Sequence, residues 1–105
     1  MPDAPPGWIG VRVQSVDADT ATALGLKTAE GALVVEPANG GPAEAAGIER
    51  GDVITQLNGA LVKDSQDFQR QVRTLFPGTL VTLVIVRDGE EQSLTLRLGQ
   101  LPNYQ

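Results

Sequence analysis

Apolar and polar positions alternate along several stretches of the chain and predict short strands. Residues 9–14 place three large apolar side chains on one face of a strand that follows a glycine turn, and residues 93–98 alternate leucine with polar residues. Residues 80–86 are nearly all apolar, so we expect this strand to be covered on both faces. Residues 31–37 and 51–59 predict two further strands, bounded by glycine or proline.

The helical segments are short and begin at residues that cap helix N-termini. Asp17 or Asp19 precedes an alanine-rich segment that Gly25 can end in the left-handed conformation. A proline starts a second helical turn at residues 42–47.

A third helix is expected to begin near Asp64 or Ser65. Phe68, Val72 and Leu75 recur at i, i+4 and i+7, which gives a narrow apolar stripe. A Pro-Gly pair directly afterwards stops this helix.

Two dipeptides are strong signals for hairpin turns, Asn58-Gly59 and Asp88-Gly89. With the strands and helices above, they predict a mixed α/β fold that is mainly β: a small, partly open β-barrel or sandwich of five or six strands, capped by two or three short helices. We expect residues 7–100 to form this single domain, with a proline-rich linker at 1–6 and a flexible tail at 101–105.

The composition narrows the classes of function. The chain has 105 residues with 13 acidic and 8 basic side chains, a formal net charge of −5, so nucleic acid is not an expected partner. Cysteine and histidine are both absent, which excludes the usual zinc sites and Ser-His-Asp or Cys-His catalysis. We therefore expect no metal, no cofactor and no catalytic residue. Residues 1–6 lack the basic start and apolar stretch of a signal peptide.

The glycine turn before the first long strand is a candidate binding site. Gly10 carries no Cβ, so a ligand can approach its N–H closely. Successive N–H groups in such a turn form a concavity for anions, and here the concavity opens into a strand edge. This combination suits a peptide whose terminal carboxylate binds the turn and whose backbone adds to the sheet. An ordinary first strand behind a glycine turn is equally compatible with these residues.

A series of motifs resembles the PDZ domain family over about residues 7–100. In order, the motifs are Trp8-Ile9-Gly10-Val11 and residues 31–35, 41–48, 51–54, 58–59, 77–79 and 87–89. The chain looks most like the PDZ modules of HtrA/Deg serine proteases, in which the ligand-binding strand opens the domain.

The resemblance implies a groove between the first strand and the helix after Asp64. Such a groove would bind extended peptides or protein C-termini that end in an apolar residue. The aromatic-apolar-glycine-apolar loop would hold the terminal carboxylate, the first strand would pair with the ligand backbone, and one face of the helix would overlook the groove. The implied peptide-binding residues are Trp8, Ile9, Gly10, Val11, Arg12, Val13, Ser65, Gln69 and Val72, with Phe68 and Leu75 turned more to the core.

The resemblance also implies a setting. The domain would be a non-catalytic, monomeric regulatory or substrate-recruiting module of an HtrA-type serine endopeptidase in the bacterial periplasm or cell envelope. Two alternatives stay open: the PDZ module of a membrane-embedded metalloprotease or secretion component, and a structural domain that self-associates through its exposed strand. A Ser-Lys enzyme is disfavoured because no nucleophile motif surrounds any of the three serines.

Overall fold

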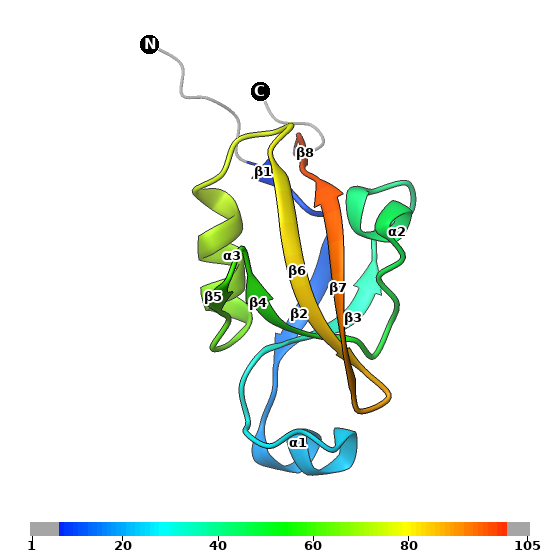
Figure 1. The fold of residues 1–105 in the computed structure, drawn as a ribbon, viewed down its shortest axis with the longest axis vertical. Coiled ribbons are helices and arrows are strands. Elements are labelled where there is room, and N and C mark those ends of the chain that lie inside the picture. Colours follow the sequence, from blue (N-terminus) through cyan, green and yellow to red (C-terminus); the bar gives the residue numbers. More distant parts are fainter. Residues whose placement is uncertain (1–6, 101–105) are drawn as a thin grey trace.

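The computed structural model describes residues 7–100, and these form eight strands and three helices (Figure 1). The strands are β1 (Gly7–Trp8), β2 (Val11–Ser15), β3 (Ala32–Pro37), β4 (Val53–Leu57), β5 (Ala60–Leu61), β6 (Leu80–Arg87), β7 (Glu90–Arg97) and β8 (Gly99–Gln100). The helices are α1 (Ala18–Leu24), α2 (Pro42–Ala46) and α3 (Ser65–Arg73). Within residues 7–100, no helix is long and apolar enough to cross a membrane.

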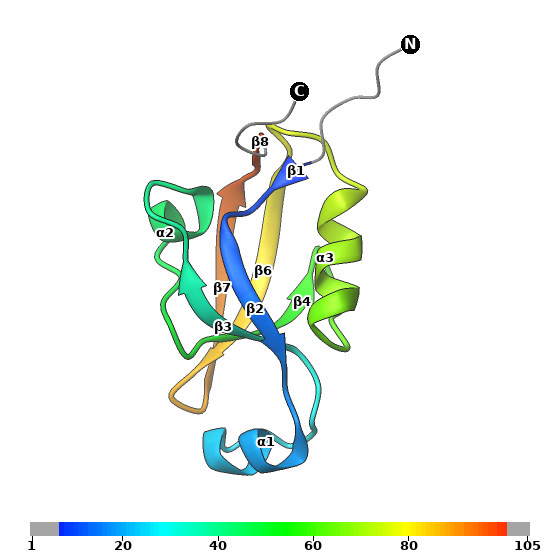
Figure 2. The ribbon, with the colours of Figure 1, turned by 180° about the vertical axis from the view of Figure 1, so that it is seen from behind.

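The main sheet is antiparallel and curled, with strand order β2-β3-β4-β6-β7 and β5 paired to β4. β1 and β8 form a separate two-stranded ribbon. The edge strands β2 and β7 do not pair with each other, so the sheet stays open. Helix α3 lies along β2, α2 packs against β7, and α1 projects at the opposite end from the ribbon (Figures 1 and 2). The predicted open, mainly β fold with short capping helices is confirmed.

Two of the helices begin at the aspartates that the sequence predicts as caps. The side chain of Asp17 accepts a hydrogen bond from the Thr20 N–H at 2.7 Å, and Asp64 accepts one from the Asp67 N–H at 2.7 Å. These bonds satisfy donors that the first helical turn leaves free. Gly25 ends α1 in the left-handed conformation, as predicted.

Both predicted hairpin turns form. Asn58-Gly59 joins β4 to β5 with φ angles of 52° and 84°, and Asp88-Gly89 joins β6 to β7 with φ angles of 53° and 80°. Positive φ at both central residues is the type I′ geometry, whose twist matches that of the flanking strands. The register of β6 and β7 follows from this turn.

A single main core fills the space inside the curled sheet. Its largest fully buried apolar side chains come from α3 and the central strands: Phe68, Ile54, Leu83, Ile85, Val34 and Val81. A smaller cluster of Val16, Ala21 and Val53 attaches α1 to the sheet. Phe68 therefore joins the core, as predicted from its helical spacing.

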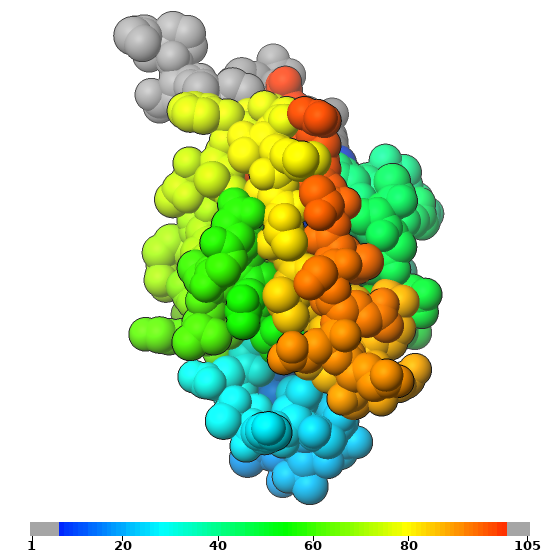
Figure 3. Space-filling model, viewed as in Figure 1, coloured from blue at the N-terminus to red at the C-terminus, as the bar shows by residue number. Residues whose placement is uncertain are grey.

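One expectation about β6 is wrong. Val81, Leu83 and Ile85 are buried, but Thr82 is exposed and Leu80 is 57% exposed. Figure 3 shows strands β6 and β7 forming the molecular surface, with no helix over them. Because the helices flank the edges of the sheet, its outer face is open to solvent, and a nearly continuous apolar run does not require cover on both sides.

Candidate functional site

The loop between β1 and β2 is held by its carbonyl groups. The Ala43 N–H, in the first turn of α2, donates to the Ile9 carbonyl at 2.9 Å. The Ala38 N–H donates to the Gly10 carbonyl at 2.8 Å. Both acceptors are therefore fixed on the side of the loop that faces α2 and the end of β3.

This arrangement sets the direction of the N–H groups. In a planar trans peptide, the C=O and the following N–H point in opposite directions. The bonded carbonyls of Ile9 and Gly10 therefore turn the N–H groups of Gly10 and Val11 away from α2 and β3. Within residues 7–100, the N–H groups of Ile9 and Gly10 have no hydrogen-bond partner. A row of unpaired main-chain donors therefore stands at the head of β2.

The conformation of Gly10 makes this turn possible. Its φ of +76° is in the left-handed region, and a Cβ at this position would lie 3.2 Å from Pro42 Cδ and 3.3 Å from Trp8 Cζ2. The Trp8 ring also lies close to the backbone of Gly41 and Gly99. Trp8 thus packs the loop against the N-terminus of α2 and against β8.

The N–H donors open into a hollow of about 190 Å³ between the loop and α3. Its lining residues come from β1, the loop, the start of β2 and the last two turns of α3: Gly7, Trp8, Ile9, Gly10, Val11, Phe68, Gln69, Val72 and Arg73. Phe68 and Val72 are buried and give the hollow an apolar floor, while Gln69 and Arg73 are exposed at its rim. We call this space the groove head.

Six of the nine predicted site residues line the groove head: Trp8, Ile9, Gly10, Val11, Gln69 and Val72. The other three lie elsewhere. Val13 is half-buried against the main core, and the Arg12 guanidinium lies 3.9 Å from the Glu36 carboxylate. The Gly10 carbonyl accepts its hydrogen bond from Ala38, the residue after β3, and backbone groups alternate along an antiparallel edge strand. Those of Arg12 therefore face β3, and those of Val11 and Val13 face the open edge.

Ser65 marks the far end of the groove. Its hydroxyl lies 3.0 Å from the Ser15 hydroxyl, and its N–H donates to the Ser15 oxygen at 3.2 Å. The end of β2 is thereby tied to the start of α3. Between this contact and Arg73, α3 is about 12 Å long at 1.5 Å per residue. The open edge of β2 runs beside it over this length (Figure 2).

Three residues of the groove head were not predicted as site residues: Gly7, Phe68 and Arg73. Phe68 was assigned to the core by its spacing, and it both fills the core and lines the hollow. Arg73 follows Val72 directly, so a shift of one position in the predicted helix phase would have found it.

Asp67 stabilises the start of the helix that forms the groove wall. It accepts a hydrogen bond from the Lys63 N–H at 2.9 Å, and its carboxylate lies 3.3 Å from the Arg70 guanidinium. The Lys63 N–H is the main cause that lowers the pKa of the Asp67 carboxyl below its usual value.

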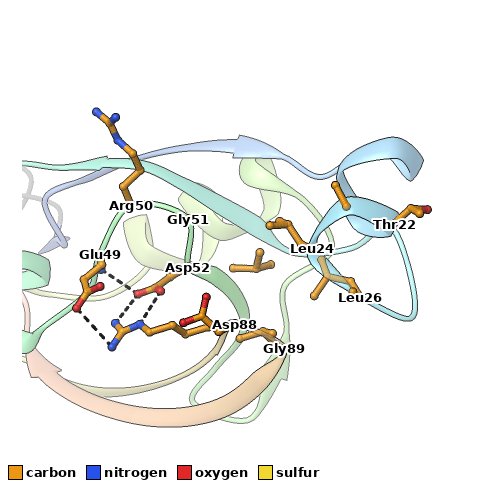
Figure 4. A pocket seen from close by; sticks show the side chains of 14 residues that line it. Thr22, Leu24, Leu26, Glu49, Arg50, Gly51, Asp52, Asp88 and Gly89 are labelled. Carbon is orange, nitrogen blue, oxygen red and sulfur yellow. Dashed lines mark hydrogen bonds and ion pairs between the residues drawn. The ribbon is translucent and has the colours of Figure 1, made fainter.

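A larger hollow, of about 570 Å³, lies between α1, residues 49–53 and the β6-β7 turn (Figure 4). Its polar groups already bind one another. The Arg87 guanidinium donates to both carboxylate oxygens of Asp52, at 2.8 and 2.7 Å, and to the Gly47 carbonyl at 2.8 Å. The hydrogen bonds to Asp52 raise the pKa of Arg87 above its usual value. Glu49 lies 3.6 Å from the same guanidinium. We call this space the α1 hollow.

Within residues 7–100, no group of three or more acidic side chains is placed to hold a metal ion. The fold and the groove head together define a class of protein: small β-rich modules that present an edge strand and a flanking helix as an open groove, with main-chain donors at one end.

Comparison with known proteins identifies the family. The sequence profile of the PDZ domain matches residues 7–98. A probable periplasmic serine endoprotease DegP-like from Rhizobium meliloti (strain 1021) is 48% identical over 97 residues, which cover 92% of this chain and 19% of that protein. A DegP-like protein from Brucella suis biovar 1 is 41% identical over 97 residues, with the same coverage. The chain thus spans about a fifth of the length of these relatives.

Solved structures of HtrA-type proteins have the same fold as this chain. The HtrA-type protease AlgW with a decapeptide superposes with a TM-score of 0.84 at 31% identity, over 95% of this chain and 31% of that chain. The HtrA3 PDZ domain bound to the phage-derived ligand FGRWV shares the fold, with a TM-score of 0.75 at 24% identity, over 90% of this chain and 86% of that one.

The chain belongs to the PDZ domain family. Its relatives are HtrA/DegP proteases, so the predicted resemblance to the PDZ modules of HtrA/Deg proteases is confirmed. In such proteases the PDZ domain is a non-catalytic module.

Proposed function

We propose that the groove binds extended peptides or protein C-termini that end in an apolar residue. The terminal carboxylate accepts hydrogen bonds from the N–H groups of Ile9, Gly10 and Val11, and the last side chain enters the space above Phe68 and Val72. The observation that carries this proposal is the fixed direction of the loop carbonyls, because it leaves the donors free at a concave, partly apolar site.

The rest of the ligand adds to the sheet. Val11, Val13 and Ser15 alternate along the open edge of β2, so their backbone groups are available to a peptide that adds a strand beside β2. With about 3.3 Å per extended residue, the roughly 12 Å between the groove head and Ser65 accommodates about four ligand residues. Ser65, Gln69 and the Arg12 side chain then face the residues upstream of the last one.

The energies favour a weak, reversible complex. Hydrogen bonds to a charged group contribute about 1.5–3 kcal/mol each, and burial of an apolar side chain contributes about as much. Ordering a flexible peptide offsets much of this, so we expect dissociation constants in the micromolar range, near −8 kcal/mol. Such affinity suits a regulatory or substrate-recruiting module.

We further propose that the domain serves an HtrA-type serine endoprotease in the bacterial periplasm. The support is that the relatives are DegP-like proteins named as periplasmic serine endoproteases, and that AlgW is an HtrA-type protease solved with a peptide. These relatives favour this setting over a membrane-embedded metalloprotease or a secretion component.

The test is a selection from random decapeptides with free carboxyl ends, followed by synthesis of an enriched peptide as the acid and as the C-terminal amide. We expect an apolar last residue and at least a tenfold loss of affinity on amidation, measured by calorimetry. Equal affinity for the two forms, or enrichment with no preference at the last position, would overturn the proposal.

A further inference from the structure

The groove head contains one charged side chain among its lining residues. Arg73 is the last residue of α3 and lines the hollow together with the loop whose N–H groups converge there. The other lining residues are apolar, glycine or glutamine. In a chain with a formal net charge of −5, the one ionised group at this place is a cation.

The side chain of Arg73 also differs from the other five arginines of residues 7–100. Within this part of the chain, each of those five has a polar partner: Arg12 with Glu36, Arg50 with the Val35 carbonyl, Arg70 with Asp67, Arg87 with Asp52, and Arg97 with the Gly78 carbonyl. Arg73 has neither an ion pair nor a side-chain hydrogen bond to any described residue. Its guanidinium is thus available to a ligand.

We propose that Arg73 binds the carboxylate that enters the groove head, and so makes the groove select a charged carboxylate over a neutral end. This inference rests on the proposed function. A guanidinium presents N–H donors in a planar fork that matches a carboxylate, and such charge-assisted bonds are stronger than neutral ones. The loop N–H groups also bond to a neutral oxygen, though less strongly than to a charged one, and Arg73 adds to their preference for the charged oxygen.

A purely structural role would have a different signature. Positive charge in the last turn of a helix interacts favourably with the helix dipole. Arg70 lies in the same last turn and does not line the groove head. Arg70→Gln is therefore the matched control for Arg73→Gln, because both variants remove one charge from the same helix end.

The experiment uses the 105-residue chain immobilised on a support and three pools of random decapeptides. The acid pool has free carboxyl ends, the amide pool has amidated ends, and the third pool is amidated with aspartate fixed at the last position. Retention of each pool on the wild type, Arg73→Gln and Arg70→Gln is measured by quantitative mass spectrometry. Circular dichroism melting confirms that all three chains are folded.

We expect the wild type to retain the acid pool at least tenfold better than the amide pool. Arg73→Gln should lower this ratio by about threefold to tenfold, while Arg70→Gln leaves it unchanged. Added salt should lower the ratio for the wild type more than for Arg73→Gln, because an exposed charge is screened.

The remaining outcomes distinguish a failure of peptide binding from a failure of the role of Arg73. A wild type that does not discriminate between acid and amide pools overturns the proposed function itself. If Arg73→Gln leaves the ratio of acid-pool to amide-pool retention unchanged, only the role of Arg73 is overturned. The same holds if Arg70→Gln lowers this ratio as much as Arg73→Gln does. If Arg73→Gln affects the aspartate pool and not the acid pool, Arg73 binds a side-chain carboxylate, and its assignment to the terminal carboxylate is wrong.

Discussion

The groove head and the α1 hollow differ in what their polar groups bind. The α1 hollow is the larger, about 570 Å³ against about 190 Å³, and carries more charge. Its central ion pair is complete, because Arg87 bonds both oxygens of Asp52 and the Gly47 carbonyl. The groove head has no ion pair, but its main-chain donors and Arg73 have no partner among residues 7–100.

The volume of a hollow is therefore a poor guide to the binding site in this domain. A polar group that already has its hydrogen bonds within the protein gains little from a ligand. A donor without a protein partner gains the net energy of a new hydrogen bond, about 1.5–3 kcal/mol when the acceptor is charged. We therefore assign stability to the α1 hollow and recognition to the groove head. Variants in the two regions should separate these properties.

The largest expected effect lies in the α1 hollow. Arg87→Gln leaves the Asp52 carboxylate, which is 1% exposed, without its charged partner. Breaking a buried ion pair on one side costs about 3–5 kcal/mol. We expect a loss of this size in urea unfolding, with peptide affinity unchanged for the folded fraction.

Arg50→Gln is the control for this variant, since Arg50 lines the same hollow and is exposed. We expect less than about 1 kcal/mol of destabilisation from it, because its single bond is to the Val35 carbonyl at the surface. Equal losses for the two variants, or a large loss of affinity for Arg87→Gln, would contradict the separation of roles.

The next largest effect is expected when one glycine in each region is replaced by alanine. Gly10 and Gly25 have nearly the same φ, +76° and +73°, but a Cβ at Gly10 meets Pro42, Gly41 and Trp8, whereas Gly25 has open space. A left-handed alanine costs about 1–2 kcal/mol. Gly25→Ala should show this cost alone, and Gly10→Ala a larger one with at least a tenfold loss of peptide affinity.

Urea unfolding and calorimetry with an enriched peptide measure both quantities. The difference between the two variants isolates the close packing of the loop, because the backbone strain is common to both. If Gly10→Ala binds peptide as tightly as Gly25→Ala, the geometry of this loop does not determine recognition.

The smallest expected effect concerns α3, the helix that forms one side of the groove. Because the pKa of Asp67 is lowered in the folded state, the folded chain binds this proton more weakly than the unfolded chain does. The stabilisation is fully present above the unfolded pKa, near pH 4, and is lost as the pH falls through the lower folded value. Asp67→Asn should therefore be less stable than the wild type at pH 7, with the difference reduced at pH 3. A difference that does not change with pH would contradict this account.

Local chemistry made much of the fold predictable from the sequence. The caps at Asp17 and Asp64, and the turns at Asn58-Gly59 and Asp88-Gly89, depend on neighbouring residues only, and all four form. The exposure of Leu80 depends on where helices from other parts of the chain lie, so the apolar run around it was misleading. The two-residue strands β1, β5 and β8 are too short to leave a pattern.

The candidate site was predictable in part for the same reason. The left-handed Gly10 is encoded in its own residue type. The contact of Ser15 with Ser65, 50 positions apart, and the free guanidinium of Arg73 are set by how α3 packs beside β2. Periodicity places a residue on a helix face to within about one position, which is too coarse to separate Val72 from Arg73.

The central claim is that the main-chain donors of the loop are free and receive a carboxylate. The most direct measurement is a titration of the ¹⁵N-labelled chain with an enriched decapeptide and with its C-terminal amide, followed by amide proton shifts. We predict large downfield shifts of the Ile9, Gly10 and Val11 amide protons with the acid and much smaller ones with the amide. Unchanged resonances at these three residues under saturating acid peptide would contradict the account.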